Sequence, residues 1–326
     1  ELASDLGLSK VYIKFEGANP TGSFKDRGMT LAVSIAKYLG AKVTIVASTG
    51  NTSASASAYS AKAGIKCVVV LPKGKVAKGK LAQSLLHGAE VVEINGNFDD
   101  ALSLVLDVTR KLSRTYPLNS FNPWRLEGQK TLAFEVVDQL GGVPDAVIVP
   151  VGNAGNISAI WKGFKELRSL GIIDKTPRLI GVQASGAAPL AKAWKEGLRR
   201  PQFIDKPETI ASAIRIGKPI NWAKALKAVK ESKGLMIDVS DGEILNAYVY
   251  LARTEGIGVE LASASTIAAL RKLRDEKFID RDETVVAIAT GHALKDPETP
   301  LKISSNVLKI SNINELIEHL KVYTHG

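Results

Sequence analysis

Three short segments of the chain combine small, polar and charged residues in patterns that could hold an anion or a reactive amine. The first reads Asn19-Pro20-Thr21-Gly22-Ser23-Phe24-Lys25-Asp26-Arg27-Gly28. Pro20 and Gly22 predict a turn, and Thr21 or Ser23 can cap the helix that follows. Lys25 would then lie in the first turn of that helix. Burial there would lower the pKa of its amine and make it a better nucleophile for a Schiff base, although most lysines are simply solvated surface residues.

The other two segments are expected to follow predicted strands and to open helices. One reads Ser48-Thr49-Gly50-Asn51-Thr52-Ser53 and the other Gly152-Asn153-Ala154-Gly155-Asn156. Free N–H groups at a helix start, with glycines that let the backbone approach closely, suit a phosphate or carboxylate. A helix start that is merely well capped explains each segment equally well. Neither has the Gly-Lys-Ser/Thr ending of a Walker loop, and the second is not the six-position dinucleotide motif.

These segments lie in a chain where apolar runs alternate with helical patterns. Continuous β-branched runs predict buried parallel strands at 43–48, 67–72, 90–94, 146–151, 179–184 and 284–290. Helical patterns are predicted at 52–63, 81–86, 99–112, 126–140, 156–170, 242–254 and 263–274, and a further one leads up to Gly40. This alternation predicts an α/β fold. The carboxyl ends of parallel strands meet at one edge of a sheet, so the polar segments can converge.

Composition narrows the classes of protein that fit. The formal charge of +10 is spread over 326 residues without a basic block, which indicates a solvated surface or a mild preference for small anions rather than nucleic acid. The one cysteine, Cys67, can form neither an internal disulfide nor a cysteine zinc cluster, so we expect no metal and a cytoplasmic protein. No apolar run is long enough to span a membrane, so we expect no membrane partner.

Taken together, the three segments resemble the fold-type-II family of pyridoxal-phosphate enzymes, in the right order from about Val11 to Pro297. Within that family they are most similar to threonine synthases. Thr52 stands where dehydratases usually have His, and the segment 152–156 replaces their run of four glycines. The segments 119–131 and 211–217 also look synthase-like.

The resemblance implies a role for each of a set of residues. Lys25 would hold pyridoxal 5′-phosphate as a Schiff base and act as the catalytic base. The cofactor would also be bound by Asn51 at its 3′-oxygen, by Gly152, Asn153, Ala154, Gly155 and Asn156 at its phosphate, and by Thr290 at its pyridine nitrogen. The substrate would be bound by Ser48, Thr49 and Thr52 at its carboxylate, and by Arg125, with Ser120 and Asn122, at its phosphate. For Arg125 an inter-domain ion pair with Glu127 or Glu135 is the alternative.

The same resemblance implies an architecture and a reaction. It implies two doubly wound open-sheet domains with the cofactor in the cleft between them. The small one would span 37–120, and the large one 1–36 and 121–326 with a C-terminal tail. The implied enzyme is a carbon–oxygen lyase acting on phosphates, which converts O-phospho-L-homoserine and water to L-threonine and phosphate. A homodimer is expected. The alternatives are a threonine or serine dehydratase with the same cofactor, and a non-catalytic binding protein for a phosphorylated metabolite.

Overall fold

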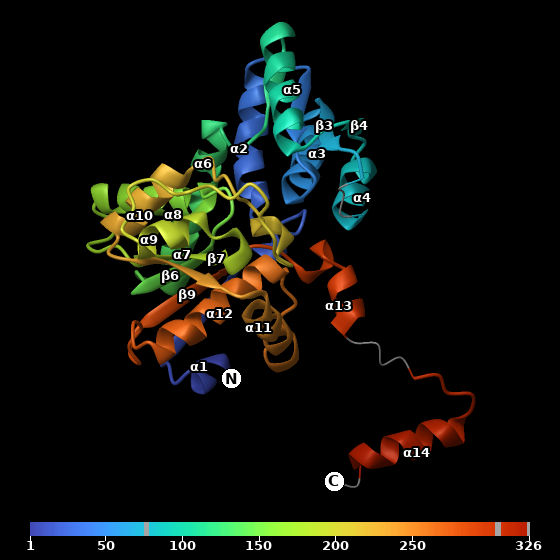
Figure 1. Ribbon diagram of the computed structural model, residues 1–326, viewed down its shortest axis with the longest axis vertical. Helices are drawn as coiled ribbons and strands as arrows, with labels where there is room; N and C mark the ends of the chain where they lie inside the picture. Colours follow the sequence, from blue (N-terminus) through green and yellow to red (C-terminus); the bar gives the residue numbers. More distant parts are fainter. Residues whose placement is uncertain (75–77, 304–307, 325–326) are drawn as a thin grey trace. The chain divides into compact units, whose positions relative to one another are not determined.

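The computed structural model describes residues 1–74, 78–303 and 308–324, and it divides into two compact units, Glu1–Asp296 and Pro297–Gly326 (Figure 1). The second unit contains α13 (Glu298–Ile303) and α14 (Ile313–Thr324). All the strands named below belong to the first unit. In the described part of the chain, no helix is long and apolar enough to cross a membrane.

The first unit contains a five-stranded parallel sheet with the strand order β1-β9-β6-β7-β8. Its strands are β1 (Lys10–Phe15), β6 (Ala146–Pro150), β7 (Arg178–Ala184), β8 (Leu235–Val239) and β9 (Thr284–Ala289). One face packs against α7 (Thr131–Leu140), α8 (Gly155–Ser169), α9 (Pro189–Lys195) and α10 (Trp222–Glu231). The other face is covered by α12 (Leu261–Asp275), on which α11 (Asp241–Thr254) packs (Figure 1). The short α1 (Leu2–Asp5) precedes β1. Because helices cover both faces, the central strands are buried throughout.

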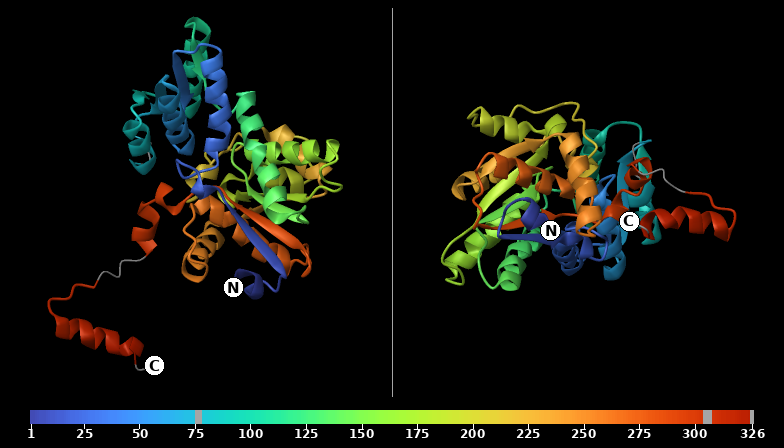
Figure 2. Two further views of the ribbon diagram at one scale, coloured as in Figure 1. Left: turned by 180° about the vertical axis from the view of Figure 1, so that it is seen from behind. Right: turned by 90° about the horizontal axis from the view of Figure 1, so that it is seen from below.

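A four-stranded parallel sheet forms the rest of the first unit, with the order β4-β3-β2-β5. Its strands are β2 (Val43–Ala47), β3 (Lys66–Pro72), β4 (Glu90–Ile94) and β5 (Thr115–Pro117). One face packs against α2 (Lys25–Tyr38), α3 (Asn51–Ala63) and α4 (Lys78–Leu86), and the other against α5 (Phe98–Lys111). Figure 2 shows this group of helices beside the larger sheet, from behind and from below.

Helix α6 (Pro123–Gln129) joins the two sheets because it packs directly against α2. The two helices cross at Gly28 and Gly128. A Cβ atom on Gly128 would lie 2.1 Å from the carbonyl oxygen of Arg27, and one on Gly28 would lie 2.8 Å from that of Arg125. Only glycine permits this contact between the two backbones. Lys25 and Arg125 each lie three residues before the crossing, so this contact brings them to the same place.

The predicted α/β fold with parallel sheets is confirmed, and all six predicted strands form within one residue of the expected ends. The predicted burial is wrong for β4, because this edge strand has no buried residue. The sequence analysis missed three strands, β1, β5 and β8. β1 and β8 are edge strands that carry Lys10, Lys14 and Asp238, and β5 has only three residues. The predicted helix 126–140 is two helices, α6 and α7, which meet at Lys130.

The four strands of the smaller sheet lie inside the predicted small domain, 37–120. Helix α2 ends at Tyr38, so the proposed boundary falls at its end. Its residues Met29, Ala32 and Val33 nevertheless pack in the core of the smaller sheet. The domain boundaries stay a prediction.

Candidate active site

Lys25 is the first residue of α2, as its sequence predicted. The turn before it contains Gly22 at a φ of 80°, in the left-handed region that favours glycine. The buried carboxylate of Asp26 accepts hydrogen bonds from the backbone N–H of Thr21 at 2.7 Å, from its hydroxyl at 2.6 Å and from Ser55 at 2.5 Å. These contacts fasten the lysine loop to α3 and so fix the start of α2.

Thr290 meets this loop although it lies 265 residues further along the chain. The N–H of Phe24 donates to the carbonyl of Thr290 at 3.0 Å, and the N–H of His292 donates to the carbonyl of Gly22 at 2.9 Å. The Thr290 hydroxyl lies 3.1 Å from that of Ser263 on α12. The end of β9 is thereby held beside the start of α2, as expected if both contribute to one site.

The asparagine segment lies between β2 and α3, with Asn51 as the first residue of α3. The side chain of Asn119 holds the end of β2 in place: its Oδ1 accepts from the N–H of Ala47 at 3.0 Å and its Nδ2 donates to the carbonyl of Ala47 at 2.9 Å. Ser48 follows directly, and its hydroxyl accepts the N–H of Gly50 at 3.2 Å. The start of α3 therefore presents polar groups at the carboxyl edge of the smaller sheet.

The segment 152–156 leads from β6 into α8, and Ala154 has a φ of 63°, which turns the backbone sharply before the helix. A Cβ atom on Gly152 would lie 3.1 Å from the carbonyl oxygen of Ala213, so the segment packs tightly under a covering loop. Both polar side-chain atoms of Asn156 are buried and have no hydrogen-bond partner among the described residues. The unpaired N–H groups at the start of α8 and this amide are well suited to an anion.

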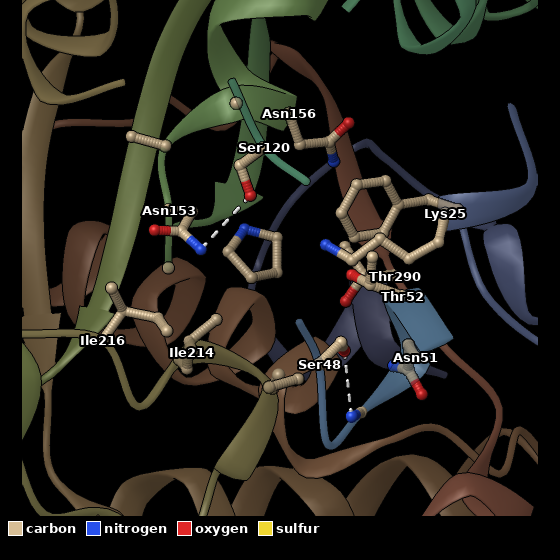
Figure 3. A pocket seen from close by; sticks show the side chains of 18 of the residues that line it. Lys25, Ser48, Asn51, Thr52, Ser120, Asn153, Asn156, Ile214, Ile216 and Thr290 are labelled. Atoms are coloured by element: carbon tan, nitrogen blue, oxygen red, sulfur yellow. Dashed lines mark hydrogen bonds between the residues drawn. The ribbon is translucent and has the colours of Figure 1, made fainter. Parts of the chain in front are cut away.

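These segments enclose one cavity of about 330 Å³ (Figure 3). That volume suits a small metabolite. Thirteen of the fourteen predicted site residues line it: Lys25, Ser48, Thr49, Asn51, Thr52, Ser120, Arg125, Gly152, Asn153, Ala154, Gly155, Asn156 and Thr290. Asn153 and Ser120 lie side by side in the cavity lining, where Nδ2 of Asn153 donates to the hydroxyl of Ser120 at 3.5 Å (Figure 3).

Asn122 is the exception, because it does not line the cavity. It caps α6 instead: its Oδ1 accepts from the N–H of Trp124 at 3.0 Å, and its Nδ2 donates to the carbonyl of Pro117 at 2.9 Å. Both ends of its amide are therefore already engaged. The residue sets the start of the helix that carries Arg125.

The side chain of Lys25 is partly buried and lines the cavity, and desolvation of its amine lowers its pKa from 10.5 to about 7. Desolvation is the largest cause, the positive charges of Arg125 and Lys80 add to it, and the negative charge of Glu260 opposes it. A substantial fraction of Lys25 is therefore neutral near pH 7. A neutral amine in such a cavity can act as a nucleophile or as a base.

Arg125 is a second cation of the cavity, buried with 3% of its surface exposed. Burial lowers its pKa from 12.5 to about 10. Its guanidinium donates to the carbonyl of Leu118 at 3.1 Å, and its Nε has no partner among the described residues. The alternative ion pair is not present: Glu127 pairs with Lys130 at 2.8 Å, and Glu135 pairs with Arg27 at 2.5 Å and Lys14 at 2.6 Å. A buried guanidinium that faces a cavity without a carboxylate partner is suited to a bound anion.

Two charged residues of the site escaped the sequence analysis, Lys80 and Glu260. Lys80 lies in α4 and Glu260 directly before α12, and their Nζ and Oε1 atoms are 2.7 Å apart. A covering loop that includes Ser212, Ile214 and Ile216 also lines the cavity. Nothing in the local sequence distinguishes Lys80 from other lysines or Glu260 from other helix-capping acids. Only the packing of the two sheets brings them to the cavity.

Comparison with known proteins finds a matching family, similar sequences and a similar solved structure. Residues 1–291 match the family model described as "Pyridoxal-phosphate dependent enzyme". The chain is 56% identical to threonine synthase of Methanocaldococcus jannaschii, over 98% of this chain and 79% of the relative, and 57% identical to that of Methanosarcina acetivorans, over 93% and 75%. The solved structure of maize serine racemase is similar in fold, with a TM-score of 0.79 and 19% identity, over 99% of this chain and 91% of that chain.

The cavity suits the cofactor of that family. Pyridoxal phosphate needs an amine, an anion site and polar partners for its ring oxygen and ring nitrogen. The cavity offers the amine of Lys25, the start of α8 with the unpartnered amide of Asn156, the amide of Asn51 and the hydroxyl of Thr290. In the residues that the structure covers, no group of three or more His, Cys, Asp or Glu side chains is placed to hold a metal. The chain therefore belongs to the pyridoxal-phosphate dependent enzyme family and, within it, to the threonine synthases.

Proposed function

We propose that the chain converts O-phospho-L-homoserine and water to L-threonine and phosphate in this cavity, with pyridoxal 5′-phosphate as its cofactor. The observation that carries the proposal is that two cations with different chemistry line one cavity. Lys25 has a pKa of about 7 and is suited to a cofactor and to proton transfer. Arg125 keeps its charge at neutral pH, because its pKa is about 10, and it has no carboxylate partner in the described structure.

The cofactor would be held by residues from both sheets. Lys25 would carry it, the N–H groups of 152–156 and the amide of Asn156 would bind its phosphate, Asn51 would donate to its ring oxygen, and Thr290 would face its ring nitrogen. When bound, the group withdraws electrons from the substrate carbon next to the amine, which makes protons on the neighbouring carbons easier to remove. A neutral hydroxyl at the ring nitrogen, in place of a carboxylate, moderates that withdrawal.

The substrate would be oriented by two groups of residues that line the cavity. Ser48, Thr49 and Thr52 stand at the start of α3, where free N–H groups and hydroxyls suit a carboxylate. The guanidinium of Arg125 suits a phosphate group, and Ser120 lines the same cavity. We propose that Asn122 acts there only through its cap on α6, because its own amide is engaged elsewhere.

Lys25 would also move protons. A base whose pKa is near the working pH could accept a proton from the substrate α-carbon and pass it to the bound cofactor, which would free the amine to accept a proton from the β-carbon. That second proton would return to the γ-carbon once phosphate has left, and the first would return to the α-carbon when water adds at the β-carbon. Ile214 and Ile216 on the covering loop contribute apolar surface over the cavity. Their burial of the reacting atoms would keep water out until it is needed at the β-carbon.

The test is an assay of products from the loaded enzyme. With O-phospho-L-homoserine we expect equal amounts of phosphate and threonine, and no release from Lys25→Ala. Incubation with threonine should give no 2-oxobutyrate. Release of 2-oxobutyrate without phosphate would assign the dehydratase reaction instead. A protein that binds phosphohomoserine without releasing any product would be a binding protein.

We further propose a homodimer in the cytoplasm. The free, buried thiol of Cys67 is compatible with a reducing compartment. Sedimentation equilibrium of the loaded enzyme tests the assembly, and a mass equal to that of one chain at micromolar concentration would contradict it.

A further inference from the structure

Glu260 connects the two sheets beneath the cavity. It precedes α12 on the larger sheet, and its Oε1 accepts from Nζ of Lys80 on α4 of the smaller sheet at 2.7 Å. The exposed fractions of the two side chains are 2% and 3%. Its second oxygen, Oε2, accepts from Nδ2 of Asn51 at 2.7 Å. One buried carboxylate thus binds a residue of α3 and a residue of α4 at once.

Glu260 is also the one carboxylate among the described residues that line the cavity, where the cations are Lys25, Lys80, Arg125 and Arg215. Two further charged residues, Lys295 and Asp26, do not line the cavity but form hydrogen bonds with the lysine loop. The amine of Lys295 donates to the carbonyl of Thr21 at 2.9 Å, and the carboxylate of Asp26 accepts hydrogen bonds from Thr21 and Ser55. Within the cavity itself, the negative charge that faces the amine of Lys25 is therefore that of Glu260.

The geometry around Glu260 is tightly specified. Its N–H donates to the carbonyl of Gly291 at 2.8 Å, and a Cβ atom on Gly291 would lie 2.5 Å from its Oε2. The residue that follows Thr290 must therefore be glycine for the carboxylate to take this place. A carboxylate only accepts hydrogen bonds, so it requires Asn51 to turn its NH₂ group, and not its oxygen, in this direction. The oxygen of Asn51 is left buried without a partner in the described structure.

We propose that Glu260 is a positioning residue of the active site: it fixes the Asn51 amide and the Lys80 ammonium, and its charge sets the balance between the protonated and neutral forms of the nitrogen at Lys25. This inference rests on the proposed function, in which Lys25 carries the cofactor. It assigns Glu260 no contact with the reacting atoms.

The proposal predicts the direction in which the pKa at Lys25 changes when either partner is removed, which a purely structural ion pair would not. The charge of Glu260 raises the pKa of Lys25, whereas that of Lys80 lowers it. Removing either partner breaks the same buried contact and destabilises the fold, since it leaves a buried charge uncompensated. The two removals should nevertheless move the proton equilibrium at Lys25 in opposite directions.

The experiment is a pH titration of the visible absorption band of the protein loaded with pyridoxal phosphate. In Glu260→Gln the midpoint should move to lower pH, and in Lys80→Met to higher pH, each by about 0.5–1 unit, an order set by nearby buried charges. Glu260→Asp, which keeps the charge, should stay close to the wild-type midpoint. Arg178→Met, which breaks a partly buried ion pair with Glu283 outside the cavity, should leave the midpoint unchanged.

Midpoints that move in the same direction in Glu260→Gln and Lys80→Met, or that do not move in either, would overturn the proposal. Melting curves of the cofactor-free proteins record the loss of stability separately. If Glu260→Gln does not fold, the comparison of Glu260→Asp with the wild type and the Lys80→Met titration remain, and a Lys80→Met midpoint that moves to lower pH or does not move would overturn the proposal. No substrate is used, so a wild type that releases no phosphate would refute the proposed function while the titration still tests Glu260.

Discussion

Lys25 and Arg125 both line the cavity, and desolvation changes the protonation of the two side chains to different degrees. Desolvation lowers the pKa of the Lys25 amine to about 7. The guanidinium of Arg125 has a pKa of about 10 and therefore stays charged at neutral pH. The charge of Arg125 is buried without a carboxylate partner in the described structure, which costs stability, and in the proposed function the phosphate of the substrate offsets that cost. Single substitutions should separate the two roles.

Arg125→Gln should raise the KM for phosphohomoserine about 10- to 100-fold, because hydrogen bonds to a charged group are worth about 1.5–3 kcal/mol. The visible band of the cofactor should persist. Arg110→Gln, on the exposed face of α5, is the matched control and should leave KM unchanged. Steady-state kinetics with phosphohomoserine measure both, and an unchanged KM in Arg125→Gln would show that this arginine does not bind substrate.

The pH dependence of the rate of cofactor loading reports the pKa of Lys25. Folding lowers it from 10.5 to about 7, so between these two values the unfolded chain holds the extra proton, and apoprotein stability should rise with pH. Only the neutral amine attacks an aldehyde, so loading of the apoprotein with pyridoxal phosphate should accelerate up to about pH 7 and then level off. Stopped-flow growth of the visible band measures this rate. A loading rate that still rises tenfold per pH unit at pH 9 would show that the pKa of the Lys25 amine is not lowered.

At the scale of elements, the crossing of α2 and α6 decides whether the site exists. Both cations lie one turn before the crossing glycines, and both line one cavity because the backbones touch there. The same contact attaches the smaller sheet to the larger one. Asn122 belongs to this scale too, since it caps α6 and does not reach the cavity.

Gly128→Ala should destabilise the protein by about 1–3 kcal/mol, because its Cβ atom would overlap the carbonyl of Arg27 and force the helices apart. The melting temperature and the affinity for pyridoxal phosphate should fall together. Gly142→Ala is the control: a Cβ atom there meets nothing within 4 Å. If Gly128→Ala melted like the control, the backbone contact would not be what holds the two helices.

At the scale of the whole molecule, two parallel sheets supply opposite walls of one cavity. Their contacts include the Lys80–Glu260 pair and the buried amine of Lys295, which reaches Gln83 on α4 as well as the lysine loop. These contacts and every residue that lines the cavity lie between residues 1 and 296. The proposed domains therefore share one site that neither could form alone.

A chain that stops after Asp296 should bind pyridoxal phosphate with the same affinity and the same visible band as the longer chain. The reason is that the cavity is complete within the first compact unit. Equilibrium titration of both proteins with the cofactor is the measurement. A large loss of affinity on truncation would show that residues 297–326 support the site.

The sequence by itself determined the parallel α/β fold and most of the site. Continuous β-branched runs indicated parallel strands, and glycines and possible caps after two of them indicated turns suited to an anion around Asn51 and 152–156. The family resemblance then singled out these two segments and the one around Lys25 as a cofactor site. The edge strands β1, β5 and β8 gave no such strand signal, whereas the edge strand β4 did. Tertiary structure alone decided that Arg125 has no acid partner among the described residues, that Asn122 caps a helix, and that Lys80 and Glu260 meet beside Lys25. Burial and charge pairing depend on which distant elements pack together, and neighbouring residues in the sequence do not encode that.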